Sequence, residues 1–233
     1  MLLATSYDVQ VSTSSGFQTL TTDLTGINST AVEIADLSNE TTYYWRVRAV
    51  VTFVPGAWSD AWNFTTRGVP TIHSVPLNAG WNMISSFIRP YITHLDTLTA
   101  SILDNLVIIK NGNGQVYFPA VAKSFINWNH EDGYQVYMQA PDTLAIEGSE
   151  VVPQGHTMTL GPGWHLISYL RNDSLSVESA LSSIATNIVI VKANDGRVYW
   201  PGFGINQIGF LKPGQGYQLY LSAASTLSYP ANN

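Results

Sequence analysis

The sequence contains no cysteine, few charged residues and no long apolar run. Without cysteine the chain has neither disulfides nor zinc–thiolate sites nor a thiol nucleophile, although export is still compatible with that composition. No stretch of about 18 apolar residues occurs, so we expect no membrane span. The start, MLLATSYDVQV, lacks a basic region followed by a long apolar core, so we do not expect it to be a signal peptide.

Charged residues make up only 11% of the chain, well below the roughly 25% of typical soluble domains. Ser, Thr, Asn, Gln and Tyr take their place, which predicts a neutral surface rich in hydrogen-bonding groups. Such a surface suits an extracellular protein that meets neutral ligands such as glycans. The net charge of −6 argues against nucleic acid as a partner.

Catalytic and cofactor motifs are missing as well. We find no Gly-x-Ser-x-Gly elbow, no His-Glu-x-x-His helix, no phosphate-binding glycine loop and no dinucleotide fingerprint. We therefore predict no cofactor and no metal. His73 and His156 occupy equivalent places in a repeat, but neither has a second ligand nearby in sequence, so we interpret both as edge-strand histidines.

Residues 1–67 carry three alternating segments, at 7–13, 43–50 and 62–66, which predict half-buried strands. Leu37 lies six residues before Tyr43 in LSNETTY, an arrangement that resembles the tyrosine corner of fibronectin type III modules. TTYYWRVRAV followed by AWSDAWNFTT is also typical of bacterial members of that family. The resemblance implies a two-sheet sandwich in which a tyrosine hydroxyl bonds backbone just upstream.

The sequence departs from the pattern of this family in one respect, because the strand that is usually third begins at Tyr7. It implies a partial module, N-terminally truncated, in a parent protein that extends further in that direction. The inner apolar face then needs another cover. We expect either that residues 1–6 fold back over it through Leu2 and Leu3, or that a homodimer forms through the incomplete module.

Residues 73–151 and 156–233 read as two copies of one unit. HSVPLNAGWNMISS matches HTMTLGPGWHLISY, VIIKNGNGQVYFP matches VIVKANDGRVYWP, and GYQVYMQAPDTL matches GYQLYLSAASTL. Asn-Gly and Asp-Gly turns predict a tight hairpin in each copy. Apolar spacing predicts one short helix per copy, over 93–103 and 176–185, the second with Ser174 as its N-cap. The fold class is thus mainly β, a partial fibronectin type III sandwich plus two similar β-rich units, each with one short helix. A single unit of about 80 residues has a marginal core, so we expect the two units to share one.

GWNMISS and GWHLISY resemble the β-repeats that follow fibronectin type III modules in C-terminal regions of large exported proteins of the Bacteroidetes and related phyla. The resemblance implies an accessory role, in a parent protein that is secreted or held at the cell surface. It implies no specific reaction.

Strand alternation predicts a polar and aromatic face on each unit. On it we place two tyrosines and two long polar side chains per copy, which suit stacking on a sugar ring and bonding to its hydroxyls. Gln115 completes the set in the first copy but is not counted among the candidates. The candidate ligand-binding residues are Tyr117, Gln135, Tyr137, Arg197, Tyr199, Gln218 and Tyr220. The four tyrosines should be more exposed than Phe118, Val136, Trp200 and Leu219, and Trp81 and Trp164 are assigned to packing.

The leading interpretation is a non-catalytic binding or adhesion module whose partner is a polysaccharide or cell-surface glycan. One alternative is a glycoside or ester hydrolase with a cleft between the units, using His130, Glu131 and Asp132. Adjacent carboxylates rarely lie on both sides of a scissile bond, where separations of about 5 to 9 Å are needed. The other alternative is a purely structural stalk.

Overall fold

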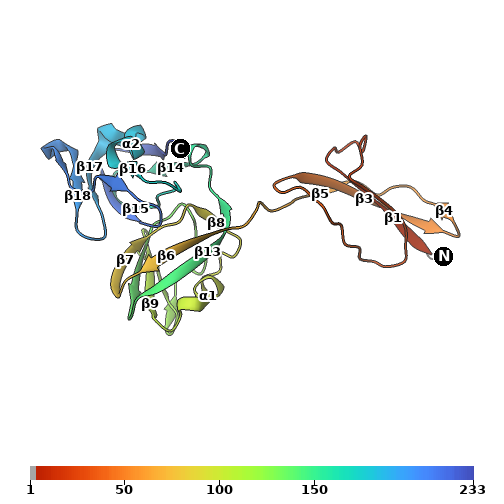
Figure 1. The fold of residues 1–233 in the computed structure, drawn as a ribbon, viewed down its shortest axis with the longest axis horizontal. Coiled ribbons are helices and arrows are strands. Elements are labelled where there is room, and N and C mark those ends of the chain that lie inside the picture. The colour runs from red at the N-terminus through yellow and green to blue at the C-terminus, as the bar shows by residue number, and fades with distance from the viewer. Residues whose placement is uncertain (1–3) are drawn as a thin grey trace. The chain divides into compact units, whose positions relative to one another are not determined.

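The computed structural model describes residues 4–233. The chain forms two compact units, Met1–Val69 and Pro70–Asn233, which are described one at a time. Both units are built mainly from antiparallel strands joined by turns and longer loops (Figure 1). Among the described residues, no helix has the length and apolar character needed to cross a membrane.

The N-terminal unit contains a single antiparallel sheet. Its strands are β1 (Ser6–Ser12), β2 (Thr22–Ile27), β3 (Thr42–Val51), β4 (Val54–Pro55) and β5 (Trp62–Thr65). They lie in the order β2-β1-β3-β4, and β5 pairs with β3 as well. The Tyr43 hydroxyl accepts a hydrogen bond of 2.9 Å from the Ser38 N–H, which is the contact that the expected tyrosine corner requires. Tyr43 is buried and stacks on Phe64.

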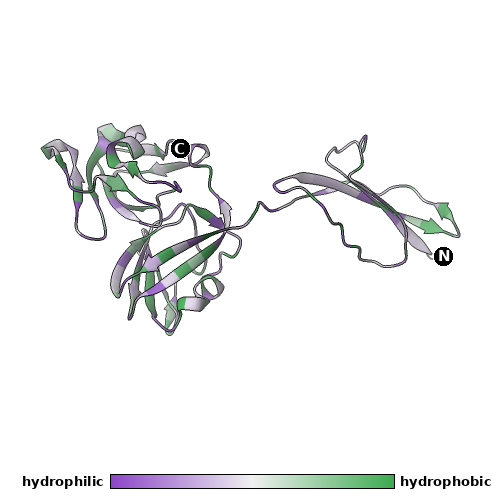
Figure 2. Cartoon of the chain, in the orientation of Figure 1, coloured by the Kyte–Doolittle hydropathy of each residue, from purple (hydrophilic) through white to green (hydrophobic). Residues whose placement is uncertain are grey.

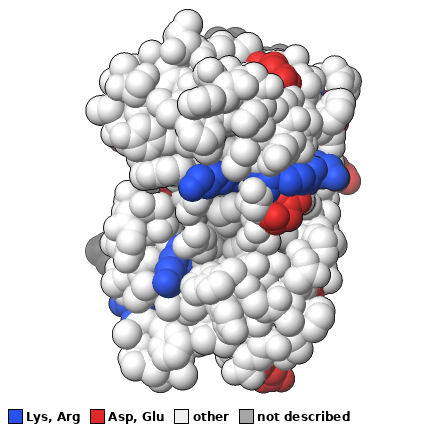
Figure 3. Space-filling model, turned by 90° about the vertical axis from the view of Figure 1, so that its left-hand side faces the viewer, with Lys and Arg blue, Asp and Glu red and all other residues white. Residues whose placement is uncertain are grey.

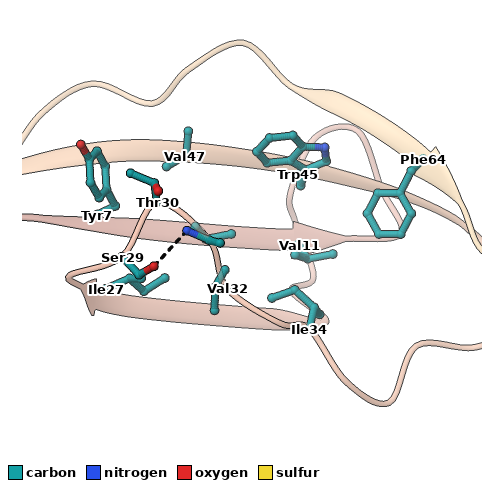
Figure 4. Close-up of a pocket in the computed structure, with 12 residues that line it drawn as sticks. Tyr7, Val11, Ile27, Ser29, Thr30, Val32, Ile34, Trp45, Val47 and Phe64 are labelled. Atoms are coloured by element: carbon teal, nitrogen blue, oxygen red, sulfur yellow. Dashed lines mark hydrogen bonds between the residues drawn. The ribbon is translucent and has the colours of Figure 1, made fainter.

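One face of this sheet lies open as an apolar groove with a cavity of about 590 Å³ (Figure 4). Tyr7, Trp45 and Val47 line it from the strands. Val32 and Ile34 line it from residues 28–41, a segment that contains no strand. Among the described residues of this unit, no second sheet faces the groove. Leu2 and Leu3, which were expected to fold over the groove, lie outside the described residues.

Self-association through this groove stays a prediction, motivated by the area of apolar surface that it exposes to water. We expect sedimentation equilibrium at micromolar concentration to show a dimer of the full chain. Residues 70–233 alone should stay folded and monomeric, because their buried clusters contain only their own side chains. A monomeric full chain, or a dimer that survives the deletion, would contradict the prediction.

Residues 70–233 contain two halves with matching elements. The strands of the first half are β6 (Thr71–Leu77), β7 (Gly80–Ile84), β8 (Ile88–Pro90), β9 (Leu106–Asn111), β10 (Val116–Phe118), β11 (Ala122–Lys123), β12 (Tyr134–Met138) and β13 (Asp142–Glu150). Those of the second are β14 (Thr157–Leu160), β15 (Gly163–Ile167), β16 (Leu175–Ser176), β17 (Ile188–Lys192), β18 (Val198–Trp200), β19 (Ile205–Asn206), β20 (Phe210–Leu211), β21 (Tyr217–Leu221) and β22 (Ser225–Ser228).

The strand orders of the two halves correspond. The sheet β11-β10-β9-β12-β7 has its counterpart in β19-β18-β17-β21-β15, and the pair β6·β13 has its counterpart in β14·β22. Buried and exposed residues alternate along the middle of β13, as expected for a strand with one buried face. Hydrophobic and hydrophilic residues both occur along this strand (Figure 2). The common topology that the repeat predicts is therefore present.

The predicted helices are shorter than expected. They appear as α1 (Leu95–Leu98) followed by a 3₁₀ turn, η1 (Ala100–Ile102), and as α2 (Val177–Ala180) followed by η3 (Ser182–Asn187). Two further 3₁₀ turns are η2 (Pro153–Gly155) and η4 (Pro201–Phe203). The N-cap of α2 is Ser176 rather than Ser174, because the Ser176 hydroxyl accepts the Ser179 N–H. Gly114 and Gly196 have positive φ in the two hairpins, as predicted.

The prediction that the two halves share one core is wrong. Buried side chains form two separate clusters, and each lies between the five-stranded sheet of one half and its smaller strand pair. In the first half the cluster includes Ile109, Val136 and Leu144, and in the second it includes Val191 and Leu219. Something other than a common core must hold the halves together.

Reciprocal backbone contacts join the halves. The Gly133 N–H donates to the Leu166 carbonyl at 3.1 Å, and the equivalent Gly216 N–H donates to the Met83 carbonyl at 3.0 Å. Isolated β-bridges accompany both contacts, Asp132 with Ile167 and Gln215 with Ile84. Each bridge thus joins the end of β15 or β7 to the residues that precede β12 or β21 of the other half. We call this set of contacts the seam.

The seam depends on the missing side chains of two glycines. A Cβ at Gly133 would lie 2.7 Å from the Ile167 carbonyl oxygen, and one at Gly216 would lie 2.7 Å from that of Ile84. These neighbours are backbone atoms, so they cannot rotate away as a side-chain end does.

We therefore predict that Gly133→Ala and Gly216→Ala each lower the free energy of unfolding by about 1–3 kcal/mol, the usual cost of overpacking. Gly155→Ala is the matched control, because nothing lies within 4 Å of its added Cβ. Chemical denaturation measures the difference. Equal effects at all three positions would show that the seam does not depend on close backbone approach.

Candidate ligand-binding face

Strand register assigns each side chain of the two large sheets to a face. Across the first sheet, Tyr117 pairs with Ile109, which pairs with Val136, and Val136 pairs with Asn82. All four of these side chains are buried. The adjacent positions therefore point to the opposite face, which we call the outer face.

An aromatic pair lies on the outer face of each half. Trp81 contacts Tyr137 edge to face with ring centroids 5.2 Å apart, and Trp164 contacts Tyr220 in the same way at 5.2 Å. A lysine completes each group. Lys110 Nζ lies 4.7 Å from the Trp81 ring centroid, and Lys192 Nζ lies 4.7 Å from that of Trp164.

The assignment of the two tryptophans to packing is wrong. Trp81 is 47% exposed and Trp164 is 51% exposed. Their neighbours along the strands take the inward positions, as Asn82 does in β7. The tryptophans, with Lys110 and Lys192, are the members of this face that sequence reasoning missed. The available signal was the presence of the same Trp, Tyr, Lys and Gln in both copies.

Four of the predicted ligand-binding residues do lie on the outer face. Gln135 and Tyr137 alternate along β12 with buried Val136, and Gln218 and Tyr220 alternate along β21 with buried Leu219. The expected order of exposure is therefore confirmed for Tyr137 against Val136 and for Tyr220 against Leu219.

For Tyr117 the prediction is wrong, because the hairpin register turns Tyr117 inward and leaves Phe118 half-buried. The Tyr117 hydroxyl donates to Asp96 Oδ1 at 2.5 Å. Burial, together with this carboxylate, raises the pKa of Tyr117 to about 12. Tyr117 is thus a core residue and not part of a ligand surface.

Tyr199 and Arg197 do not lie on the predicted face either. Tyr199 pairs with buried Val191 and packs partly against the core of the second half. It is half-buried, as is Trp200, so the expected contrast between them is not seen. The Arg197 guanidinium binds Asp195 at 2.7 Å and reaches carbonyls after β19. Both side chains have their contacts on the inner side of the hairpin.

A groove with a cavity of about 200 Å³ lies where the outer faces of the two halves meet. Gln135 and Lys110 line it from the first half, and Trp164, Leu166 and Gln218 line it from the second. The two predicted glutamines, which are 83 residues apart in sequence, are thus brought into one site.

The repeated hairpins form part of this groove. Asn111, Gly112 and Gly114 of the first hairpin line it, and Gly112 approaches Leu166 so closely that an added Cβ would lie 3.4 Å from its side chain. In the reciprocal contact, Asn194 of the second hairpin donates a 3.2 Å hydrogen bond to the Trp81 carbonyl. Each hairpin therefore reaches the other half, which explains why both copies retain it.

One face of the molecule carries mostly uncharged side chains (Figure 3). The longest run of Lys and Arg side chains crosses the middle of that view, with acidic side chains beside it. A surface of this kind favours ligands that are neutral and rich in hydroxyl groups over strongly charged ones.

His130, Glu131 and Asp132, the residues of the hydrolase alternative, are not among those that line the groove. Burial, and to a smaller extent the nearby charge of Arg89, lowers the pKa of His130. Burial raises the pKa of Asp132. The structure brings His156 to this loop, with its Nδ1 3.4 Å from Glu131 Oε1. His156, which has no second ligand group nearby in sequence, therefore has one nearby in space.

His73, the counterpart of His156, has different surroundings. Its Nδ1 lies 2.9 Å from the Ser86 hydroxyl, and its Nε2 would lie 3.2 Å from a Cβ added at Gly214. The ring is buried and contacts Phe87. Burial lowers the pKa of His73 to about 4. His73 is a packed structural histidine, as predicted.

A comparison with protein-family models gives no match, and neither does a comparison with curated protein sequences. The functional argument for this chain therefore depends on its geometry.

The lowered pKa of His73 predicts a pH dependence of stability. Between its ordinary value of about 6.5 and its folded value of about 4, the unfolded chain binds a proton that the folded chain does not. The free energy of unfolding should therefore fall as the pH is lowered through this window. His73→Asn should reduce the slope between pH 4.5 and pH 6 by up to one proton, measured by denaturation at several pH values. An unchanged slope would contradict the assignment.

Proposed function

We propose that this chain is a non-catalytic binding module that holds a neutral glycan in the groove between its two halves. The single observation that carries the proposal is the meeting of Trp164, Gln135 and Gln218 in one groove. The two glutamines come from different halves, so only the assembled pair of halves offers this site.

The chemistry of the groove matches a sugar ring. A pyranose presents an apolar C–H face, which packs on an exposed indole, and hydroxyl groups, which bond to amides. Trp164 supplies the indole, while Gln135, Gln218 and the Lys110 ammonium supply donors. The cavity of about 200 Å³ is smaller than the ~300–1,000 Å³ of typical ligand pockets, so it suits one sugar ring of a longer chain.

The exposed Trp81–Tyr137 pair extends this surface on the first half. Its arrangement repeats that of Trp164 and Tyr220, with a lysine beside each tryptophan. A polysaccharide that contacts both pairs gains from two weak sites at once, because the second contact is intramolecular. We therefore expect polymers to bind more tightly than short oligosaccharides.

The hydrolase alternative receives less support from this geometry. His130, Glu131 and Asp132 lie outside the groove lining, so a sugar held by Trp164 would not reach them through that site. A stalk without ligand remains the competing class. A purely structural role does not require the same Trp, Tyr, Lys and Gln on both outer faces, so their presence in both halves argues against a stalk.

The N-terminal unit fits an accessory role in a larger exported protein. Its antiparallel sheet and its Tyr43–Ser38 contact support the proposed resemblance to fibronectin type III modules. We propose that the parent protein is secreted or displayed at the cell surface and that the groove anchors it to a polysaccharide.

Isothermal titration and affinity electrophoresis with soluble neutral polysaccharides test the proposal. We expect binding by at least one of β-glucan, xylan, chitin oligomers or starch. Trp164→Ala should weaken it at least tenfold, about 1.4 kcal/mol, by removing the stacking surface.

Phe210→Ala is the matched control, because Phe210 is 56% exposed and does not line the groove. Tyr117→Phe is a second control, which should lower stability slightly through the lost bond to Asp96 and leave binding unchanged. Lack of binding to every polysaccharide, or an equal loss with Phe210→Ala, would refute the proposal.

A further inference from the structure

Three potential metal ligands meet where the two halves of residues 70–233 join. His130 and Glu131 lie in the loop before β12, and His156 lies between η2 and β14. One ligand atom from each residue lies within 4.8 Å of the others. The imidazole rings of His130 and His156 are nearly perpendicular, at 88°, with centroids 5.4 Å apart. The cluster therefore combines two imidazoles with one carboxylate.

The spacing is close to that of a bound cation. Zinc lies about 2.0–2.2 Å from nitrogen and oxygen ligands in a tetrahedral site, so its ligand atoms are roughly 3.4 Å from one another. His156 Nδ1 and Glu131 Oε1 already have this separation, at 3.4 Å. The remaining distances need to shorten by little more than 1 Å, starting from the 4.8 Å limit. Side-chain rotation supplies movements of this size.

His130 also has ligand capacity that the protein does not use. Its Nε2 is buried, and it has no hydrogen-bond partner among the described residues. Buried polar atoms are nearly always paired with protein, water or an ion, so this nitrogen requires a partner.

The equivalent place in the other half provides an internal comparison. There His73 is held by the Ser86 hydroxyl and covered by Gly214. The repeat replaces Ser86 by Tyr169, and Gly214 corresponds to Glu131. One histidine of the pair has thus lost its hydroxyl partner and gained a carboxylate. This exchange turns a packing site into a ligand set.

We propose that His130, Glu131 and His156 bind a zinc-like divalent cation, with a water molecule completing the coordination. Because His130 and Glu131 belong to the first half and His156 to the second, the cation would connect the halves beside the seam. Such a cation binds the folded chain and stabilises it by mass action. The proposal does not depend on the ligand of the groove.

The test uses the full chain without a histidine tag, freed of metal by chelator. We expect zinc chloride to bind at one ion per chain in isothermal titration and to raise the melting temperature. Cobalt(II) should give the intense visible absorption of a tetrahedral site. Magnesium should do neither, because it prefers oxygen ligands and keeps several waters.

His156→Asn and Glu131→Gln should each weaken zinc binding at least tenfold. Glu131 is partly exposed and not part of the core, so its substitution should leave the fold intact, as circular dichroism will verify. His94→Asn is the matched control, because His94 lies 3.8 Å from Asp96 as an exposed imidazole–carboxylate pair and belongs to no three-residue ligand group among the described residues. Absence of zinc binding, or a loss with His94→Asn equal to that with His156→Asn, would overturn the proposal.

Discussion

Two backbone hydrogen bonds, each from a glycine of one half to the end of a strand in the other, organise residues 70–233. Gly133 and Gly216 approach the carbonyls of Leu166 and Met83 because neither glycine has a Cβ to prevent it. The halves have separate cores, so their relative position is set by this seam and not by shared apolar packing. The groove and the histidine cluster both combine residues from the two halves. Their geometry therefore depends on the seam.

Much of this architecture was predictable from the sequence. Matched GYQ and GW segments predicted a duplicated β-unit, and the turns at Gly114 and Gly196 predicted the hairpins. Alternation assigned the faces of β12 and β21 correctly because both strands lie inside a sheet, where one face meets a core. The same rule failed in the three-residue strand β10, since Val116, Tyr117 and Phe118 are all apolar or aromatic and fix no phase.

Other features could not be assigned from strand alternation. Trp81 and Met83 share a face, and the apolar character of that face suggested a core. In the structure, part of the equivalent face of the second half contacts the first half, where Leu166 lies against Gly112. Period-two alternation shows which residues lie on the same face of a strand. It does not show whether that face packs in the unit's own core or against the second copy. Contacts between halves, including the approach of His156 to Glu131, arise from tertiary packing alone.

The two copies of the unit have similar residues on their outer faces but different surroundings at their equivalent histidines. The outer faces keep the same Trp, Tyr, Lys and Gln in both halves, which suits a repeated binding surface. The two histidine positions have diverged, one into a packed residue and one into a ligand set. A common scaffold can thus carry unlike sites, because the fold constrains the backbone and not the chemistry of each loop.

Native-state hydrogen exchange of the seam amides tests the account most directly. If the seam fixes the halves, the Gly133 and Gly216 amides should exchange only through global unfolding of residues 70–233. Their exchange should then be as slow as that of the Val136 amide in β12, which lies between β9 and β7. Fast exchange at both glycines beside a protected Val136 would show that the halves separate locally. That result would contradict the claim that the seam builds the groove.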